Sequence, residues 1–306
     1  MKEHWNAFCA LSLVHFAAFP ECASGEGPIL DTIDRVTDDD FFDALEVGRI
    51  NDDQVRKEVA RRIRASHMQV VFGAQPIILG GKLNLNSLDS AERNNAVEIL
   101  SRFVDQAAEI GCQRFVLLSG PNPAVKDQTA ATDALVQAIG SLCLCGKGKG
   151  VSIALETFDR DVEKKALIGP VNEAAALARV LRSNFPDFGL LYDMGHMPLL
   201  EETPVIALKV LKSYLVHVHV GNCVKRSGMA SYGDQHPRFG FPGGENDVTE
   251  LVDFIRALFH VGYLSRRNRG AMLPWVGFEI RPQPGETSKL VIANLKRAWR
   301  QAWAQA

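Results

Sequence analysis

The chain of 306 residues is long enough for one large α/β domain or two ordinary ones, and its 46% hydrophobic and 23% charged residues are typical of a globular protein. Its formal net charge of −2 shows no basic excess, which argues against a nucleic-acid partner and favours a small-molecule substrate. Its six cysteines form no CxxC pair, so we predict neither a zinc knuckle nor a disulfide framework, and we expect reduced thiols in a cytoplasmic protein.

The first apolar run, residues 8–19, is open to two interpretations. It resembles the hydrophobic core of a signal peptide, but Glu3 offsets the charge of Lys2 before it, and His15 interrupts it. It is also too short to cross a bilayer. We therefore predict a buried first strand here and no membrane segment.

Short β-rich runs then alternate with longer amphipathic runs along the whole chain, which is typical of repeated βα units. The predicted strands are residues 8–16, 42–47, 68–74, 112–120, 151–157, 188–196, 214–220 and 274–280. The predicted helices are residues 28–37, 51–66, 90–111, 129–146, 171–184, 203–213, 246–262 and 286–302. Cap residues support two of the helices: Asn51 opens one, and another begins at Asp89 or Ser90 and ends at Gly111.

Strict alternation of eight strands and eight helices predicts an α/β fold, a (β/α)₈ TIM barrel that forms a single domain over residues 1–306. A doubly wound sheet would show a glycine-rich phosphate turn after its first strand. The sequence FPECASGEGP at that place lacks the turn. No low-complexity linker divides the chain.

Potential metal ligands end four consecutive predicted strands: Glu156, Asp193, His219 and Glu279. In such a barrel the chemistry gathers at the carboxyl ends of the strands, so these side chains should converge on one side of the mouth. Three carboxylates and one imidazole suit Mn²⁺, Mg²⁺ or a similar octahedral cation. Without a cation, burial of three acids together would be costly.

Further polar residues lie near the same strand ends. His196 follows Asp193 by three residues, and His15 and Glu46 come near the ends of the first two strands. His236 and Arg238 lie in the connection 221–246, which is unusually long for a βα loop and therefore predicts a functional loop. We count these five as candidate substrate-binding or catalytic residues.

The strand YLVHVHV, residues 214–220, places His217 and His219 on the same face, because side chains alternate along a strand. His219 lies at the strand exit, level with the three carboxylates, and is the predicted ligand. His217 lies one layer deeper and is predicted to be a hydrogen-bonded residue that supports the site.

The motifs Glu156, DMGH at 193–196, HVH at 217–219 and Glu279 together resemble the xylose-isomerase-like superfamily of metal-dependent sugar isomerases and epimerases. The ketose 3-epimerase and hydroxypyruvate isomerase branches are similar in these motifs, and the resemblance extends from about residue 8 to residue 302. It implies the ligand set Glu156, Asp193, His219 and Glu279, with His196 on the substrate. It places Arg238, in HPRFGFPGGEN, in the role of the family's loop arginine.

The resemblance implies proton abstraction next to the carbonyl of a keto sugar, through a cis-enediolate stabilised by a divalent metal. Mn²⁺ is the first candidate for this metal, with Mg²⁺, Co²⁺ and Zn²⁺ as alternatives. Glu156 and Glu279 are the predicted acid/base pair, and His236 is a further acid or base.

The long loop is also similar to that of the catalytic subunits of bacterial C-glycoside deglycosidases, which cleave 3-keto sugar C-glycosides. This leaves a metal-dependent lyase acting on 3-oxo-glycosides as the alternative function. The expected assembly is a homo-oligomer, or a complex with a small β-rich subunit if the protein is such a lyase. A metal-dependent nuclease, which shares the barrel, is disfavoured by the charge balance.

Overall fold

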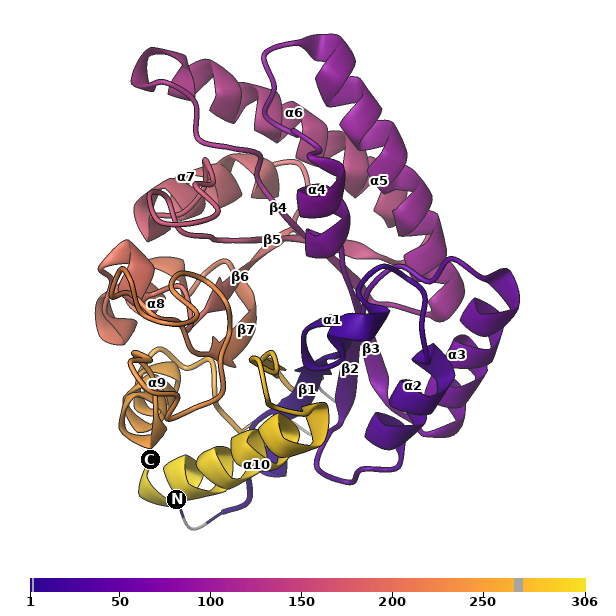
Figure 1. Cartoon of the computed structure of the whole chain (residues 1–306). Coiled ribbons are helices and arrows are strands. Elements are labelled where there is room, and N and C mark those ends of the chain that lie inside the picture. Colours follow the sequence, from indigo (N-terminus) through magenta and orange to yellow (C-terminus); the bar gives the residue numbers. More distant parts are fainter. Residues whose placement is uncertain (2, 267–271) are drawn as a thin grey trace.

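In the computed structural model, which describes residues 1, 3–266 and 272–306, eight parallel strands close into a barrel (Figure 1). Each strand pairs with the next in sequence, and the last pairs with the first. The strands are β1 Ala10–Val14, β2 Ala44–Val47, β3 Gln69–Gly73, β4 Arg114–Leu118, β5 Ser152–Glu156, β6 Gly189–Asp193, β7 Leu215–Gly221 and β8 Trp275–Glu279. The predicted TIM barrel is confirmed, and the run at 8–19 contains its first strand.

Helices surround the barrel, and ten α-helices lie within the described residues. They are α1 His15–Ala18, α2 Ile29–Thr37, α3 Asp53–Ala65, α4 Gln75–Gly81, α5 Ser90–Ile110, α6 Gln128–Lys147, α7 Val171–Arg182, α8 Pro204–Leu211, α9 Val248–His260 and α10 Ser288–Gln305. Four short 3₁₀ helices accompany them: η1 Trp5–Ala7, η2 Pro20–Cys22, η3 Val125–Asp127 and η4 Pro198–Leu200.

The cap residues account for several helix boundaries. Asp89 accepts a hydrogen bond from the backbone of Ala91 at the start of α5, and Gly111 ends that helix with a left-handed φ of 95°. At the start of α3 the cap is Asp52, one residue after the predicted Asn51, and its carboxylate accepts two backbone N–H groups. The prediction of a side-chain cap at the start of α3 was therefore right, but the cap is one residue later than predicted.

The helices α1 and α4 were not predicted, and both follow directly on a strand. Strand β1 ends at Val14, so His15 begins a helical turn instead of extending the strand. Helix α4 begins at Gln75, carries Pro76 in its first turn and ends before Lys82, which has a left-handed φ of 49°. Both are too short for the helical period to be visible in the sequence.

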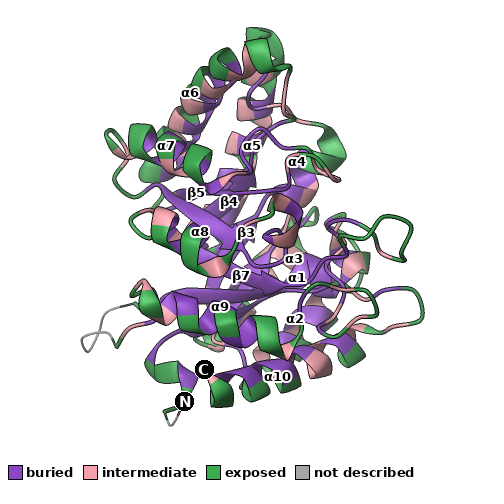
Figure 2. Ribbon diagram, turned by 90° about the vertical axis from the view of Figure 1, so that its left-hand side faces the viewer, coloured by how far each residue is buried: buried purple, intermediate pink, exposed green. Residues whose placement is uncertain are grey.

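The core has two main parts and a small third cluster of Val14, Phe16 and Ala17. Figure 2 shows buried strands inside helices whose outer faces are exposed. The larger part fills the space between the strands and the helices. A smaller apolar layer fills the lower barrel interior and consists of Ala10, Val71, Val116, Ala154, Leu191 and Trp275. The polar residues of the site lie above this layer, so the barrel is packed below them and open only at its mouth.

Helix α6, with the 3₁₀ turn before it, is apolar enough by composition to cross a membrane, with a mean hydropathy of 1.2 over 18 residues. Half of that stretch is buried, and α6 packs beside α5 and against β5. This is the position of an outer barrel helix, whose apolar face covers the strands.

The connection between β7 and α9 is tied together at its base by two asparagines. Asn222 accepts the backbone N–H of Asn246 at 2.8 Å and donates to the carbonyl of Arg238 at 3.0 Å. Asn246 donates to the carbonyls of Gly221 and Met194. The long loop predicted from the sequence is therefore anchored at both ends over the barrel mouth.

Candidate metal centre and active site

Four side chains from consecutive strands converge at the barrel mouth: Glu156 of β5, Asp193 of β6, His219 of β7 and Glu279 of β8. One donor atom from each lies within 4.8 Å of all the others. The Nδ1 atom of His219 is central, 2.8 Å from Glu279 Oε2, 3.5 Å from Glu156 Oε1 and 3.9 Å from Asp193 Oδ2. The structure thus brings together the four residues that the strand ends predicted as ligands.

These four donor atoms are buried, and none of them makes a hydrogen bond of good geometry, the 2.8 Å contact between His219 Nδ1 and Glu279 Oε2 included. An unpartnered buried polar atom is costly, and four that face one another are rare in a folded protein. Glu156 and Asp193 have their second oxygens occupied, by Gln75 Nε2 at 2.6 Å and by the Gly195 N–H at 2.5 Å. The donor set therefore fits a divalent cation bound by three carboxylate oxygens and one imidazole nitrogen.

Glu46 lies behind His219 and not on the substrate side where the sequence placed it. Its Oε2 atom is 2.9 Å from His219 Nε2, and its Oε1 atom accepts from Ser12 Oγ at 2.6 Å. His217 Nε2 is 3.1 Å from the same Oε1 atom. A carboxylate on the far nitrogen of a ligating histidine orients the ring and increases its basicity. Glu46 is therefore a supporting residue, and His217 lies in the deeper layer, as expected.

Space for this support comes from Gly277 of β8. A Cβ atom at this position would lie 2.2 Å from Glu46 Oε1 and 2.7 Å from the ring of His219. No larger residue fits without displacing one of them. The glycine is thus required by the close approach of the two side chains and not by its backbone conformation.

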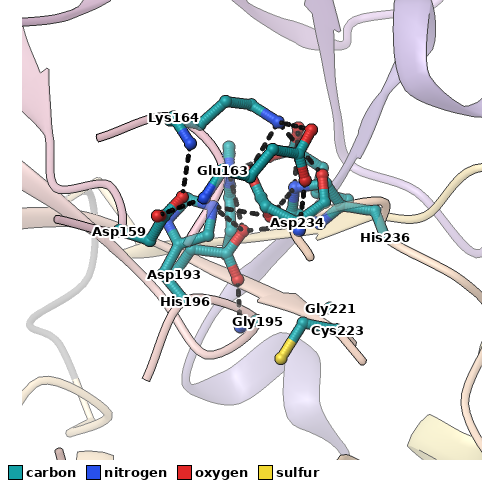
Figure 3. A network of polar contacts seen from close by, with 12 residues as sticks. Asp159, Glu163, Lys164, Asp193, Gly195, His196, Gly221, Cys223, Asp234 and His236 are labelled. Atoms are coloured by element: carbon teal, nitrogen blue, oxygen red, sulfur yellow. Dashed lines mark hydrogen bonds and ion pairs between the residues drawn. The ribbon is translucent and has the colours of Figure 1, made fainter. Parts of the chain in front are cut away.

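A second group of donors adjoins the first and shares Asp193 with it. Asp193, His196 and His236 also offer donor atoms within 4.8 Å of one another. Asp234 Oδ1 lies 3.2 Å from His196 Nε2 and 2.9 Å from His236 Nε2 (Figure 3). These residues could hold a second cation beside the first. His196 is fixed by its Nδ1–H, which donates to the carbonyl of Thr157 at 2.7 Å.

The charges in the site compensate one another. Burial raises the pKa of Glu156 and of Asp193. Despite burial, the imidazoles of His196 and His236 hold the pKa of Asp234 well below its usual range. Against the same burial, Asp234 and Glu279 raise the pKa of His236 to about 9. Asp234 and His236 therefore favour each other's charged form.

A cavity of about 190 Å³ opens beside the donors. Its polar lining consists of Gln75, Lys164, Asp234, His236, Glu279 and Arg281. Its apolar wall consists of Phe16, Ala17, Ala23, Pro76, Leu79 and Phe158. The cavity is smaller than the roughly 300–1,000 Å³ of pockets for drug-sized ligands, so it suits a small molecule with both polar and apolar parts.

Two predicted substrate-binding residues lie away from this cavity. The guanidinium of Arg238 donates to Glu286 Oε1 at 2.8 Å and to backbone carbonyls of its own loop, and it lines a different surface depression. His15 is buried at the start of α1, where its Nε2 lies 2.8 Å from Thr32 Oγ1. The structure therefore does not bring these two residues together with the rest of the site, and both have partners elsewhere.

Three residues of the site were missed. Gln75 follows β3 and binds Glu156, so the rule of polar residues at strand ends could have found it. Asp234 lies two residues before His236 in the long loop, and that spacing was the available signal. Lys164 lies in the connection between β5 and α7, and no pattern in the sequence marks it.

Comparison with known proteins identifies the family to which this barrel belongs. Residues 32–286 match the family model described as xylose isomerase-like TIM barrel. A search of curated protein sequences finds no match to the chain.

Solved structures of similar fold cover almost the whole chain. One is D-psicose 3-epimerase with D-tagatose from Clostridium cellulolyticum, 18% identical, with a TM-score of 0.67 and 96% of each chain covered. Another is the IOLI protein with a bound zinc atom, 15% identical, with a TM-score of 0.72 and 97% of this chain and 98% of that chain covered.

A third is 3-keto-D-glucoside 4-epimerase from E. coli, 14% identical, with a TM-score of 0.66 and 95% of this chain and 99% of that chain covered. At these identities the structures share the barrel with this chain, and the match to the family model extends over most of its sequence. The chain belongs to the xylose isomerase-like TIM barrel family.

Proposed function

We propose that the protein is a divalent-metal-dependent isomerase or epimerase that moves a proton next to the carbonyl of a keto sugar. The observation that carries the proposal is the convergence of four buried donor atoms, none with a well-oriented hydrogen bond, beside a small cavity lined by both polar and apolar residues. D-Psicose 3-epimerase and 3-keto-D-glucoside 4-epimerase, which have a similar fold, support the same class of substrate.

Glu156, Asp193, His219 and Glu279 would hold the cation. A bound divalent cation supplies Lewis acidity, which polarises the carbonyl and stabilises negative charge on the substrate oxygens. Three carboxylates favour Mn²⁺, with Mg²⁺, Co²⁺ and Zn²⁺ as alternatives, and the IOLI structure is titled with zinc.

Glu279 is the better of the two glutamates for removing the proton. It lines the cavity, whereas Glu156 is fully buried and its Oε2 atom already accepts from Gln75. Glu279 Oε1 lies 3.6 Å from His236 Nε2, so a carboxylate and an imidazole lie side by side in the lining of the cavity. We assign proton abstraction to Glu279 and proton return to His236, with His196 orienting a substrate oxygen. In this assignment His236 takes the place of Glu156 in the acid/base pair predicted from the sequence.

The alternative is a lyase that cleaves 3-oxo-glycosides after the same proton abstraction. The observation that favours it is the position of His236, which lines the cavity near the apolar wall formed by Phe16 and Phe158. An imidazolium in this place can protonate a departing aglycone, and the wall can receive an apolar one.

The test is to incubate the Mn²⁺-loaded protein in D₂O with free ketoses and, separately, with a 3-oxo-glucoside of a chromogenic phenol. Deuterium in recovered or epimerised sugar supports the isomerase, and release of the phenol supports the lyase. Deuterium exchange into neither compound, with no phenol released, would contradict both functions. Elemental analysis of protein prepared without chelators checks the metal, and its complete absence would contradict the ligand set.

Two accompanying proposals concern the setting of the enzyme. We propose a cytoplasmic enzyme, which is supported by six cysteines that are all free thiols. We propose a homo-oligomer, or a complex with a small β-rich subunit if the lyase activity is found. Sedimentation of the purified chain, alone and with proteins encoded beside it, tests the second proposal.

A further inference from the structure

Two loops that are far apart in the sequence meet over the site. The connection between β5 and α7 carries Glu163 and Lys164, and the connection between β7 and α9 carries Asp234 and Gln235. Glu163 accepts the backbone N–H of Asp234 and the side-chain amide of Gln235, both at 2.6 Å. Lys164 Nζ donates to the carbonyl of Asp234 at 3.2 Å and lies 3.3 Å from its Oδ2 atom (Figure 3).

The first of these loops is rigid before it reaches the second. The buried carboxylate of Asp159 accepts the backbone N–H groups of Val162 and Glu163 at 2.7 Å and of Lys164 at 2.8 Å. Three hydrogen bonds to one carboxylate hold the backbone in a tight turn. Glu163 and Lys164 therefore project from a fixed base.

The second loop is shaped to receive them. Gly233 has a φ of 96°, and a Cβ atom there would lie 2.3 Å from Glu163 Oε2. Only glycine satisfies both the backbone conformation and the close approach. The two loops are thus packed against each other at the residue that precedes Asp234.

The contact with Lys164 determines which carboxylate oxygen of Asp234 faces the two histidines. Asp234 is buried, and its Oδ2 atom faces the ammonium, which leaves Oδ1 for the imidazoles of His196 and His236. His236 has an unusual left-handed φ of 47°, and its carbonyl accepts the N–H of Arg281 at 2.6 Å. A non-glycine residue keeps such a conformation only where its surroundings impose it, as at functional sites.

We propose that Glu163 and Lys164 are positioning residues that clamp Asp234, and through it hold His196 and His236 in the orientation that the reaction needs. The expected effect of Glu163 and Lys164 on turnover rests on the proposed function. The clamp itself is a property of the loops and can be measured without substrate.

The experiment compares the full chain with Lys164→Met, Glu163→Gln and the rescue variant Lys164→Arg. Lys225→Met is the matched control, because Lys225 is an exposed lysine of the connection between β7 and α9 and pairs with Glu201. Hydrogen exchange by mass spectrometry follows residues 231–237, metal titration gives the affinity of the four-ligand site, and steady-state kinetics separate kcat from KM.

In Lys164→Met and Glu163→Gln we expect exchange in residues 231–237 to accelerate by roughly tenfold or more, as for the loss of a hydrogen bond to a charged group. Mn²⁺ affinity at the four ligands should stay within about threefold, and kcat should fall more than KM rises. Lys164→Arg should recover part of the protection, and Lys225→Met should behave as wild type.

Unchanged exchange in residues 231–237 in both Lys164→Met and Glu163→Gln would overturn the clamp, whatever the substrate proves to be. Failure of the wild-type protein to act on any keto sugar would instead overturn the proposed function. The exchange measurement would still decide the role of the two residues. If Lys164→Met fails to fold, the milder Glu163→Gln decides.

Discussion

The Nε2 atom of His219 lies 2.9 Å from the Oε2 atom of Glu46, on the side of the imidazole away from the other three ligands. This leaves Nδ1 as the atom that faces Glu156, Asp193 and Glu279. If His219 binds a cation, as proposed, Glu46 therefore determines that Nδ1 is the nitrogen that binds it.

Replacement of Glu46 by Gln should weaken metal binding without removing a ligand. The loss of the negative charge behind His219 is expected to lower the affinity by roughly 10–100-fold. Titration with Mn²⁺ under competition from a chelating dye measures this. Glu109→Gln removes an exposed carboxylate of α5, which pairs with Arg56, and should leave the affinity unchanged. Equal affinities for Glu46→Gln and wild type would show that Glu46 does not support the ligand.

Replacement of Glu279 by Gln should leave the barrel folded and lower kcat by roughly 10²–10⁴-fold, because the side chain can no longer take a proton. Circular dichroism checks the fold, and solvent deuterium exchange into the sugar measures the step directly. Arg238→Lys is the comparison, since Arg238 pairs with Glu286 outside the cavity and should change turnover by less than about threefold. An unaltered exchange rate in Glu279→Gln would remove this residue from the proton transfer.

Replacement of Gly277 by Ala should destabilise the protein, because the new Cβ atom would lie 2.2 Å from Glu46 Oε1 in the packed barrel. Overpacking of this kind costs about 1–3 kcal/mol, and the displaced Glu46 should also weaken metal binding. Gly148→Ala is the control, since nothing lies within 4 Å of its Cβ position and its φ is −71°. Urea denaturation of both variants measures the difference, and equal stabilities would contradict the packing argument.

His15 should make the stability of the protein dependent on pH. Burial lowers the pKa of its imidazole to about 4, below the usual 6.5, so the unfolded chain binds more protons than the folded one between these values. The contribution of neutral His15 is complete above pH 6.5 and is lost as the pH falls towards 4. At pH 5 the loss is about 2 kcal/mol.

His15→Gln keeps a donor for Thr32 but does not titrate, so its unfolding free energy should fall less between pH 7 and pH 5 than that of wild type. Urea denaturation at the two pH values measures the difference. Parallel losses in both proteins would show that His15 remains protonated in the fold or is not the group responsible.

Much of this architecture is visible in the sequence, because strand and helix periods are local. The four ligands could be selected because each ends a strand, and parallel strands in a barrel bring their carboxyl ends to one mouth. His217 and His219 could be separated by depth, since their spacing and the strand end fix which lies higher. The helices α1 and α4 were not predicted, because segments this short do not show a helical period in the sequence.

The roles of the remaining residues were decided by tertiary contacts. Glu46 and Arg238 both looked suited to a substrate, but one is enclosed by His219, His217 and Ser12 and the other is bound by Glu286. A buried polar side chain needs a hydrogen-bond partner, and for these two residues the partner comes from a distant part of the chain.

The eight-stranded barrel and the four donors at its mouth could be inferred from local periodicity and strand ends alone. Which other groups contact these donors and line the cavity became known from the folded chain. Asp234 is held by Glu163, 71 residues away in the chain, and His219 by Glu46, 173 residues away. Contacts over such separations depend on how the loops close over the barrel, and no local pattern encodes them.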